Sequence, residues 1–309
     1  MLSGSLRIFR VAGIDVYLHW SWLIVAFLLP EIHNQLGKQT TMAWTALEFL
    51  SLFGIVLLHE FGHALACRSV GGRADQIMLW PLGGVAFVQP PPRPGAWLWS
   101  IAAGPLVNLA LVPVLFGLVV MAEQAGWPET LPQVYQYLFI MALVNLGLFI
   151  FNIIPIYPLD GGQILHALLW FVIGRVRSLQ IVSVMGLVIS GAALLACALI
   201  QQWWLVLVAA FMAWQSWVGW KRASVLGKLA AAERHPGFAC PACGEAPPRG
   251  DFWNCTQCGQ MFDPYDRNAT CPRCGTQYDE MICLLCGQRS DFDDWSAQPV
   301  PVAEGSAER

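Results

Sequence analysis

The stretch "LFGIVLLHEFGHALAC", residues 52–67, places two histidines and a glutamate in a segment that otherwise has the composition of a membrane span. A transmembrane helix needs about 20 apolar residues. Ionisable side chains inside such a helix are costly, and where they occur they usually serve a function. The fold and the chemistry of the chain therefore both depend on why His59, Glu60 and His63 lie there.

The whole chain has the composition of a membrane protein. Of its 309 residues 56% are hydrophobic and only 12% are charged, whereas about a quarter are charged in a soluble domain. Residues 11–220 hold few charges, and the polar remainder holds eight of the ten cysteines. With a net charge of −3 and no broad basic surface, we expect no nucleic-acid binding. We predict four segments: a membrane domain (1–222), a linker (223–237), a cysteine-rich domain (238–289) and a disordered tail (290–309).

The apolar segments predict an all-α polytopic membrane protein with about six transmembrane helices, followed by a small cysteine-rich domain. The expected spans lie near residues 14–30, 42–67, 97–121, 134–157, 178–200 and 203–220. With these spans, the four basic clusters all fall on one side of the membrane. The clusters are Arg7 with Arg10, Arg68 with Arg73 and Arg93, Arg175 with Arg177, and Lys221 with Arg222, Lys228 and Arg234. The positive-inside rule makes that side cytoplasmic. Both termini and the cysteine-rich domain are then expected in the cytoplasm.

The segment "IMLWPLGGVAFV", residues 77–88, has the pattern of a β-hairpin. Two short β-prone runs flank a turn that contains Gly83 and Gly84. A plain interfacial loop is the alternative, and the pattern alone does not exclude it. Because non-helical backbone at membrane depth must be buried in protein or line a cavity, a hairpin here is expected to be re-entrant and to lie beside the polar site.

The motif "HEFGH" has the geometry of a metal site. Its two histidines are four residues apart, so on a helix they lie on one face and can ligate one zinc ion. The glutamate beside the first histidine, Glu60, can act on a zinc-bound water. The alternative is a set of polar side chains that hydrogen-bond between packed helices.

A catalytic zinc site takes three protein ligands, so a third is needed. His19 beside Trp20 has the pattern of an interfacial anchor, Glu48 lies three turns before His59, and His166 has the pattern of a buried core histidine. Asp160 differs because two prolines precede it and two glycines follow it in "NIIPIYPLDGG". Such a break in a helix lets a carboxylate project into a cavity, and we therefore predict Asp160 as the third ligand.

Three motifs in this order resemble those of the site-2 protease family of intramembrane zinc metalloproteases: "HEFGH" (59–63), "GPLVN" (104–108) and "NIIPIYPLDGG" (152–162). The resemblance covers roughly residues 10–220 and is far more specific than the first motif alone. It implies that His59, His63 and Asp160 bind a catalytic zinc ion and that Glu60 is the catalytic glutamate. It also implies that Asn152 lines the site and that Asn108 and its small neighbours let the spans pack closely.

The resemblance further implies an endopeptidase that hydrolyses peptide bonds in or near the transmembrane helices of membrane-protein substrates within the lipid bilayer. Zinc lowers the pKa of bound water from 15.7 to about 7, and Glu60 would accept the water proton and pass it to the leaving amine. A helical substrate must unwind, and the edge strand of the hairpin could receive it by β-addition. The Asn152 amide could hold the substrate backbone or the oxyanion, and a purely structural role for it is equally open.

The C-terminal region contains four C-x-x-C-G motifs. Their cysteines are Cys240 and Cys243, Cys255 and Cys258, Cys271 and Cys274, and Cys283 and Cys286. Eight cysteines suffice for two structural Cys₄ zinc sites, and disulfides are disfavoured in the cytoplasm. The region resembles a double zinc ribbon. We expect consecutive pairs to share an ion, and a cross-braced pairing is the alternative.

Closed Cys₄ sites are structural, so the ribbons are expected to dock a cytosolic partner, position substrate or mediate self-association. A second class of function is a non-catalytic membrane protein with a structural or transported metal and a partner-binding ribbon module. The free glutamate beside the predicted ligands favours the enzyme, because a closed site would not need it.

Overall fold

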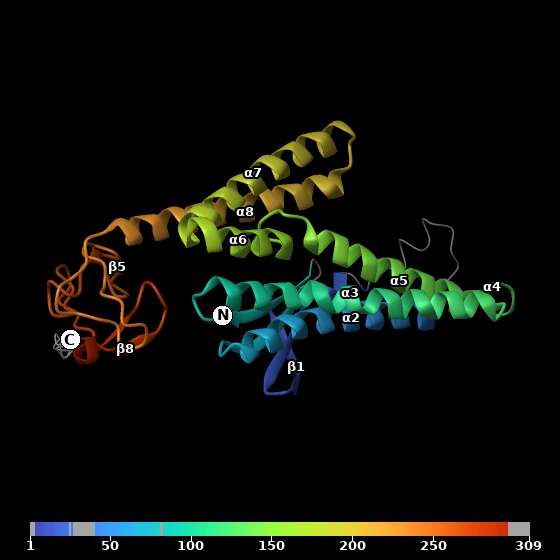
Figure 1. The fold of residues 1–309 in the computed structure, drawn as a ribbon, viewed down its shortest axis with the longest axis horizontal. Coiled ribbons are helices and arrows are strands. Elements are labelled where there is room, and N and C mark those ends of the chain that lie inside the picture. Colours follow the sequence, from blue (N-terminus) through green and yellow to red (C-terminus); the bar gives the residue numbers. More distant parts are fainter. Residues whose placement is uncertain (1–3, 25, 27–40, 81–82, 296–309) are drawn as a thin grey trace, which may run out of the picture. The chain divides into compact units, whose positions relative to one another are not determined.

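The computed structural model describes residues 4–24, 26, 41–80 and 83–295. The chain divides into two units, Met1–Lys221 and Arg222–Arg309, which are treated separately below (Figure 1).

The first unit is mainly helical. Four of its described helices are long and apolar enough to cross a membrane: α2 (Met42–Ser69), α3 (Pro94–Gln124), α5 (Pro132–Ile153) and α7 (Arg175–Leu199). The short helices are α4 (Trp127–Thr130) and α6 (Asp160–Ile173), and the last helix, α8 (Trp203–Ala231), continues into the second unit. The second to fifth predicted spans therefore correspond to α2, α3, α5 and α7, and the sixth lies within α8.

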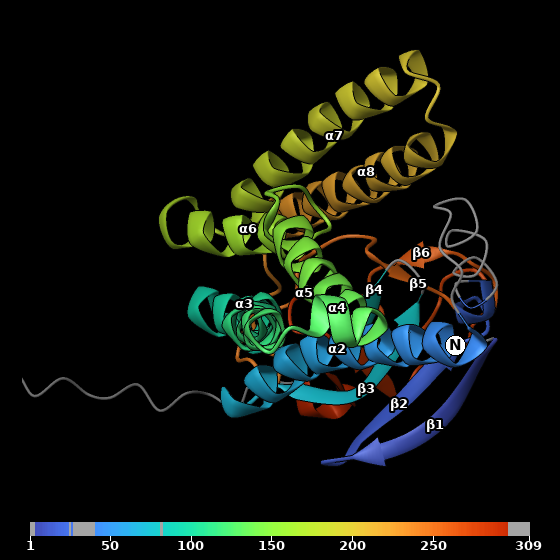
Figure 2. The same cartoon turned by 90° about the vertical axis from the view of Figure 1, so that its right-hand side faces the viewer.

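Helix α3 lies at the centre of this unit and packs against α2, α5 and α6. Helices α3 and α2 lie very close together: a Cβ atom added at Gly62 of α2 would lie only 2.7 Å from the carbonyl oxygen of Ala103 of α3. Helices α7 and α8 run side by side as an antiparallel pair (Figures 1 and 2). The arrangement brings the start of α6 next to the C-terminal half of α2.

A four-stranded sheet accompanies the helices, with the order β1 (Ser5–Val11), β2 (Ile14–His19), β3 (Arg73–Trp80) and β4 (Gly83–Gln89). Strands β2 and β3 are parallel, and the other two pairs are antiparallel. Buried apolar side chains from β2 and β3 pack with Val56 and Ala64 of α2 in one core. The all-α expectation is therefore wrong in this respect: the unit is mostly helical, but a mixed sheet packs on α2.

The first predicted span is also wrong at its start. Residues 14–19 form β2, in which Ile14 and Val16 are fully buried while Asp15 and Tyr17 are half-buried on the other face. This alternation has the period of two that a half-buried strand requires. Because the strand runs directly into an apolar segment, the sequence resembles one continuous span. Most of the remainder of that predicted span, residue 25 and residues 27–30, lies outside the described residues.

The two β-prone runs at residues 77–88 do form strands. Strands β3 and β4 pair as an antiparallel hairpin in which Leu79 lies opposite Gly84 and Trp80 opposite Gly83. Residues 81–82 lie outside the described residues. The hairpin is thus confirmed as secondary structure, and its re-entrant position in a membrane stays a prediction.

The second unit is small and contains little regular structure. Its strands are β5 (Trp253–Asn254) with β6 (Met261–Phe262) and β7 (Glu280–Ile282) with β8 (Arg289–Asp291), followed by the 3₁₀ helix η1 (Phe292–Trp295). Its core consists of buried aromatic side chains and cysteines, with Trp253, Phe262, Tyr265 and Trp295 as the largest side chains.

The predicted linker and tail both differ from the structure. Helix α8 extends to Ala231, so much of the expected linker (223–237) is helical, and Arg234 then forms a β-bridge with Pro248. The first residues of the expected disordered tail (290–309) belong to β8 and η1, and Trp295 is fully buried. Residues 296–309 lie outside the described residues.

Candidate metal centres

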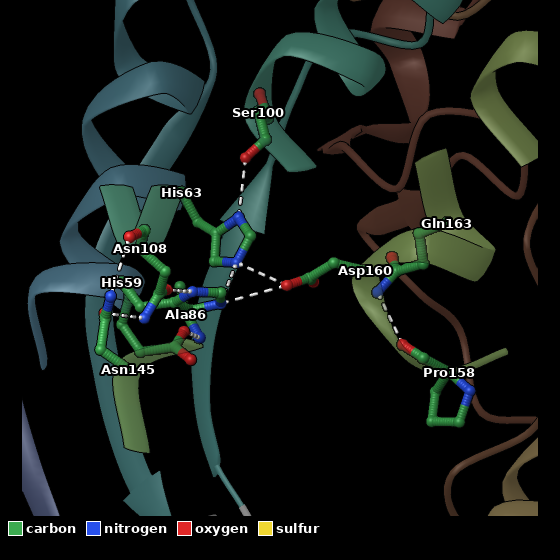
Figure 3. A network of polar contacts seen from close by, with 10 residues as sticks. His59, His63, Ala86, Ser100, Asn108, Asn145, Pro158, Asp160 and Gln163 are labelled. Carbon is green, nitrogen blue, oxygen red and sulfur yellow. Dashed lines mark hydrogen bonds and ion pairs between the residues drawn. The ribbon is translucent and has the colours of Figure 1, made fainter. Parts of the chain in front are cut away.

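Three predicted ligands that are distant in sequence meet at one point of the first unit. The Nε2 atoms of His59 and His63 on α2 lie 3.1 Å apart. The Oδ2 atom of Asp160, the first residue of α6, lies 3.1 Å from Nε2 of His59 and 3.4 Å from Nε2 of His63 (Figure 3). Both histidines are buried, and the three side chains could hold a metal ion.

Hydrogen bonds from helix α3 and beyond fix the other nitrogen of each ring. Nδ1 of His63 donates to the backbone carbonyl of Ser100 at 2.9 Å, and Nδ1 of His59 donates to Oδ1 of Asn108 at 2.5 Å. The Asn108 amide is itself oriented, because its Nδ2 donates to Oδ1 of Asn145 at 2.9 Å. With the protons on Nδ1, both Nε2 lone pairs face the carboxylate of Asp160.

The space for this cluster depends on a glycine of the "GPLVN" motif. A Cβ atom added at Gly104 would lie 2.2 Å from Nε2 of His63 and 2.8 Å from Nε2 of His59. Any side chain here would displace the imidazoles. Gly104 therefore lets the backbone of α3 approach the two rings closely.

Asp160 reaches the cluster through the predicted break between two helices. Helix α5 ends at Ile153 and α6 begins at Asp160. The two glycines after it are sterically required, since a Cβ atom at Gly161 would lie 2.2 Å from the carbonyl oxygen of Ile153, and one at Gly162 would lie 2.5 Å from the carbonyl carbon of Ile156. The first turn of α6 can therefore fold back onto the loop only with this sequence.

Glu60 lies beside the cluster without belonging to the three-residue set. Its side chain is buried, with 4% of the residue exposed. The backbone N–H of Ala86 in strand β4 donates to Oε2 of Glu60 at 2.8 Å. Its Oε1 has no hydrogen-bond partner in the part of the chain that the structure describes. One oxygen is thus anchored to the hairpin, and the other is available for proton transfer.

The residues that the sequence excluded as ligands lie elsewhere. The ring of His19 stacks on Trp80, and Nδ1 of His166 hydrogen-bonds with Oγ of Ser178 at 2.9 Å. Glu48 is buried on α2 outside the cluster.

Asn152 is half-buried one residue before the end of α5. Gly83 and Gly84 lie in β4, the strand that contacts Glu60 through Ala86.

Sequence reasoning missed part of this network. It did not identify Ser100 or Asn145. It assigned to Asn108 and its small neighbours, Gly104 among them, a role in helix packing rather than in holding or admitting the two histidines. Ser100 contributes a backbone carbonyl, which every residue type has. The only available signal was the pair of asparagines in apolar spans, because buried amides in lipid need partners.

The donor set fits zinc. Two imidazole nitrogens and one carboxylate are common zinc ligands, and three of them leave one position of a four-coordinate ion free. The orientation of both rings by second hydrogen bonds is also typical of metal-ligating histidines. In addition, Gly104 has no side chain that would obstruct the two Nε2 atoms.

The eight cysteines of the second unit form two clusters. One contains Cys240, Cys243, Cys283 and Cys286, and the other contains Cys255, Cys258, Cys271 and Cys274. The four motifs have the same backbone: in each, the glycine N–H donates to the carbonyl of the first cysteine. All four glycines have φ between 73° and 78°, the left-handed region that favours glycine. In each motif the glycine therefore permits the tight turn that follows the second cysteine.

The expected consecutive pairing of these motifs is wrong, and so is the cross-braced alternative. The first motif joins the fourth and the second joins the third, so one site encloses the other along the chain. A physical reason is that the residues just before the first motif and after the last are held together: the N–H of Ala239 donates to the carbonyl of Trp295 at 2.9 Å. This contact places Cys240 near Cys286, with the two sulfurs 3.8 Å apart.

A tyrosine supports the inner cysteine site. The hydroxyl of Tyr278 donates to Sγ of Cys255 at 3.1 Å and lowers the pKa of that thiol to about 6. Because the thiolate is the form that binds metal, this hydrogen bond favours zinc binding at neutral pH. The two Cys₄ clusters thus have the ligands of a double zinc ribbon, and the inner one has an outer contact that favours the thiolate.

Comparisons with known proteins agree with the geometry of the first unit. Peptidase family M50 matches residues 47–134 and 129–196. A zinc metalloprotease of Methanocaldococcus jannaschii, MJ0392, is 33% identical over 185 residues, which are 60% of this chain and 51% of that protein. The stage IV sporulation protein FB of Bacillus subtilis is 34% identical over 122 residues, 38% of this chain and 39% of that one.

A solved structure is also similar. The site-2 protease from Methanocaldococcus jannaschii superposes with a TM-score of 0.52 at 28% sequence identity, covering 70% of this chain and 95% of that chain. The chain spans about half the length of the zinc metalloprotease that it matches.

Proposed function

Because the chain belongs to peptidase family M50, the family of the site-2 proteases, we propose that it is an intramembrane zinc endopeptidase that hydrolyses peptide bonds in or near the transmembrane helices of membrane proteins. One observation carries the proposal: His59, His63 and Asp160 converge from separate segments, and Glu60 lies beside them without being part of the ligand set. The chain is an integral membrane protein, and four of its described helices are long and apolar enough to span a bilayer.

The two Nε2 atoms of His59 and His63 and the carboxylate of Asp160 would hold the zinc ion. When bound, zinc supplies a water molecule whose pKa falls from 15.7 to about 7 and polarises the carbonyl of the scissile peptide. The residues around it keep the ligands in place: Asn108 holds His59, and the Ser100 carbonyl holds His63. Loss of such an outer contact typically costs about 10–100-fold in metal affinity or activity.

Glu60 acts as the general base and then as the general acid. Its free Oε1 would accept a proton from the attacking water and deliver it to the leaving amine nitrogen. The hydrogen bond from Ala86 to Oε2 prevents the carboxylate from rotating away. This bond also connects the proton-transfer group directly to the backbone of β4.

The substrate would bind along β4. This strand is the last in the sheet order, so one of its edges has no strand partner among the described residues. A substrate helix must unwind to expose its carbonyls, and pairing with this edge near Gly83 and Gly84 would restore its lost backbone hydrogen bonds. The amide of Asn152 would hold the substrate backbone or the developing oxyanion, although a structural role for that amide accounts for its position equally well.

The active site would lie in the cytoplasmic half of the membrane. Basic residues gather at one end of the helices: Arg68 ends α2, Arg93 caps α3 and Arg175 begins α7. His63 is six residues from the end of α2, about 9 Å at 1.5 Å per residue. The positive-inside rule assigns that end to the cytoplasm. The same rule supports cytoplasmic termini and ribbons, which would bind structural zinc and dock a partner, position substrate or self-associate.

A comparison of cells tests this proposal. We expect membrane-protein fragments that are present with the wild-type chain to disappear when the chromosomal copy carries Glu60→Gln. The measurement is quantitative proteomics of membrane and soluble fractions. A non-catalytic membrane protein with a structural or transported metal, the rival function, predicts identical fragment patterns in both strains.

A further inference from the structure

We infer that helices α7 and α8 position the third metal ligand: Ser216 and Gly219, with Gly186, form a socket for Tyr157 that holds the loop preceding Asp160 in place. The inference rests on the proposed function only in taking His59, His63 and Asp160 as a metal site. It does not require that the protein cleave any substrate.

Asp160 needs the support of neighbouring helices to hold its position, because it begins α6 whereas the two histidines lie on α2. It follows a loop of residues 154–159 whose own backbone bonds are local, from Ile156 N to the carbonyl of Ile154 and from Leu159 N to the carbonyl of Ile156. Among the described residues, the side chain of Asp160 makes its hydrogen bond and ion pairs with the two histidines. The loop also accepts a side-chain bond from Nε2 of Gln163 to the carbonyl of Pro158 at 3.0 Å, but Gln163 belongs to α6 itself, so this bond does not attach the loop to the neighbouring helices.

A buried hydroxyl supplies the missing attachment. Oγ of Ser216 on α8 donates to the backbone carbonyl of Tyr157 at 2.6 Å, and Ser216 is fully buried. Tyr157 is three residues before Asp160. Because a carbonyl in an apolar environment needs a partner, this bond fixes the loop to α8 rather than to solvent.

Two glycines shape the space around the same tyrosine. A Cβ atom added at Gly219 would lie 2.7 Å from Cε1 of the Tyr157 ring, and one added at Gly186 on α7 would lie 2.5 Å from Oγ of Ser216. Ser216 and Gly219 are three residues apart and thus lie on one face of α8. Helix α8 therefore contributes the hydroxyl of Ser216 and, at Gly219, the space for the Tyr157 ring. Helix α7 contributes, at Gly186, the space for the Ser216 hydroxyl.

Displacement of Tyr157 would reach the ligand directly. A Cβ atom at Gly162 would lie 2.5 Å from the backbone nitrogen of Tyr157, so the first turn of α6 touches the residue that the socket holds. Asp160 begins that turn. Loss of the Ser216 bond should therefore weaken metal binding at His59, His63 and Asp160 more than it affects the fold.

The first experiment compares Ser216→Ala with Ser190→Ala in the full-length chain. Ser190 is a matched control, because it is buried in α7 and its hydroxyl has no hydrogen-bond partner in the described parts of the chain. The protein is loaded with Co²⁺ in detergent and titrated with a chelator. Sulfur-to-metal charge-transfer bands report the two cysteine sites. Because these sites also give ligand-field bands, the histidine–aspartate site is reported by the part of the ligand-field spectrum that is lost when His59 and His63 are both replaced by alanine.

We expect Ser216→Ala to lose Co²⁺ from the histidine–aspartate site at an about 10-fold lower chelator concentration, with unchanged charge-transfer bands, and Ser190→Ala to match wild type. The Tm of both variants is measured in the same detergent, because a purely structural role would lower Tm without shifting the metal titration. Equal chelator sensitivity of the two serine variants would overturn the inference.

A second pair of variants tests the shape of the socket. Gly219→Ala drives a methyl group into the Tyr157 ring, whereas Gly191→Ala on α7 meets nothing within 4 Å. We expect the first to weaken Co²⁺ binding at the histidine–aspartate site and the second to leave it unchanged; equal binding in both would contradict the socket. A wild-type protein that binds the metal as described but releases no membrane-protein fragments would refute the proposed function and leave this inference standing.

Discussion

At the scale of single residues, the two histidines of α2 differ in what holds their second nitrogen. His63 relies on a backbone carbonyl, that of Ser100, and His59 relies on the side chain of Asn108. A carbonyl within a helix moves only with the helix, whereas an amide side chain can be removed by substitution. The ligand geometry at His59 is therefore the part of the site that is most open to mutational testing.

Removal of the Asn108 amide should weaken the metal site. In Asn108→Ala, His59 loses its hydrogen-bond acceptor and its ring orientation, so we expect zinc affinity to fall about 10–100-fold. Asn145→Ala should have a smaller effect, because Asn145 acts on His59 only through Asn108. Zinc retention after dialysis against a graded chelator series measures both. An effect of Asn145→Ala larger than that of Asn108→Ala would contradict the proposed order of contacts.

Prediction from sequence works best at this scale, for residues whose type conflicts with their surroundings. His59, His63 and Asp160 were identifiable because apolar segments rarely contain such groups, and the structure brings them together. Ser100 and Gly104 were not identifiable from spacing. One acts through its backbone and the other through the absence of a side chain.

At the scale of elements, strand β4 connects the sheet to Glu60, the proposed catalytic glutamate. The N–H of Ala86 donates to Oε2 of Glu60 on α2 at 2.8 Å. This bond ties the geometry of the proposed base to the same strand that we propose to receive substrate. Occupation of the β4 edge would then affect how Glu60 is held.

Replacement of Ala86 by proline tests this connection. Proline lacks the N–H, and an edge strand tolerates it where that N–H makes no bond to another strand. We expect Ala86→Pro to reduce proteolysis by about 10-fold or more with zinc content unchanged, because Glu60 loses its anchor. Ala86→Gly keeps the N–H and should retain most activity. Equal rates for the two variants, measured on the same membrane-protein substrate, would argue against the anchor.

The elements also show where periodicity misleads. The second to fifth spans were predicted because each is a long apolar run between polar breaks, and these runs are helices. Strand β2 was missed because its alternating pattern, Ile14 and Val16 against Asp15 and Tyr17, merges with the apolar residues that follow. The hairpin was predicted from two β-prone runs around "PLGG", but Gly83 and Gly84, which were expected in the turn, belong to β4. A boundary without glycine or proline gives no such signal.

At the scale of the whole molecule, the chain combines a membrane unit that carries the candidate catalytic centre with a unit that folds around two nested cysteine sites. The nested pairing means that the outer site spans residues 240–286, whereas the inner site spans residues 255–274. The sequence could not distinguish the pairings, because all four motifs are alike and the pairing depends on contacts between distant residues, such as that of Ala239 with Trp295.

Zinc counting distinguishes these pairings. Full-length protein should bind two ribbon zinc ions in addition to one at the membrane centre. Cys243→Ser with Cys286→Ser removes two ligands of one site and should lose one ion, whereas Cys243→Ser with Cys258→Ser damages both sites and should lose two. Metal analysis of the purified double variants gives the counts. Consecutive pairing predicts the opposite result for the two combinations.

The central claim is that Glu60 performs proton transfer at a metal site that it does not help to form. The most direct measurement is the cleavage rate and the zinc content of purified full-length Glu60→Gln, assayed on a single-pass membrane protein whose fragments depend on the wild-type chain. Glu48→Gln is the matched control, since Glu48 is also buried on α2 but lies outside the cluster. We predict that Glu60→Gln loses about 10²–10⁴-fold in rate and keeps its zinc, while Glu48→Gln cleaves like wild type. Cleavage at the wild-type rate by zinc-loaded Glu60→Gln would contradict the account.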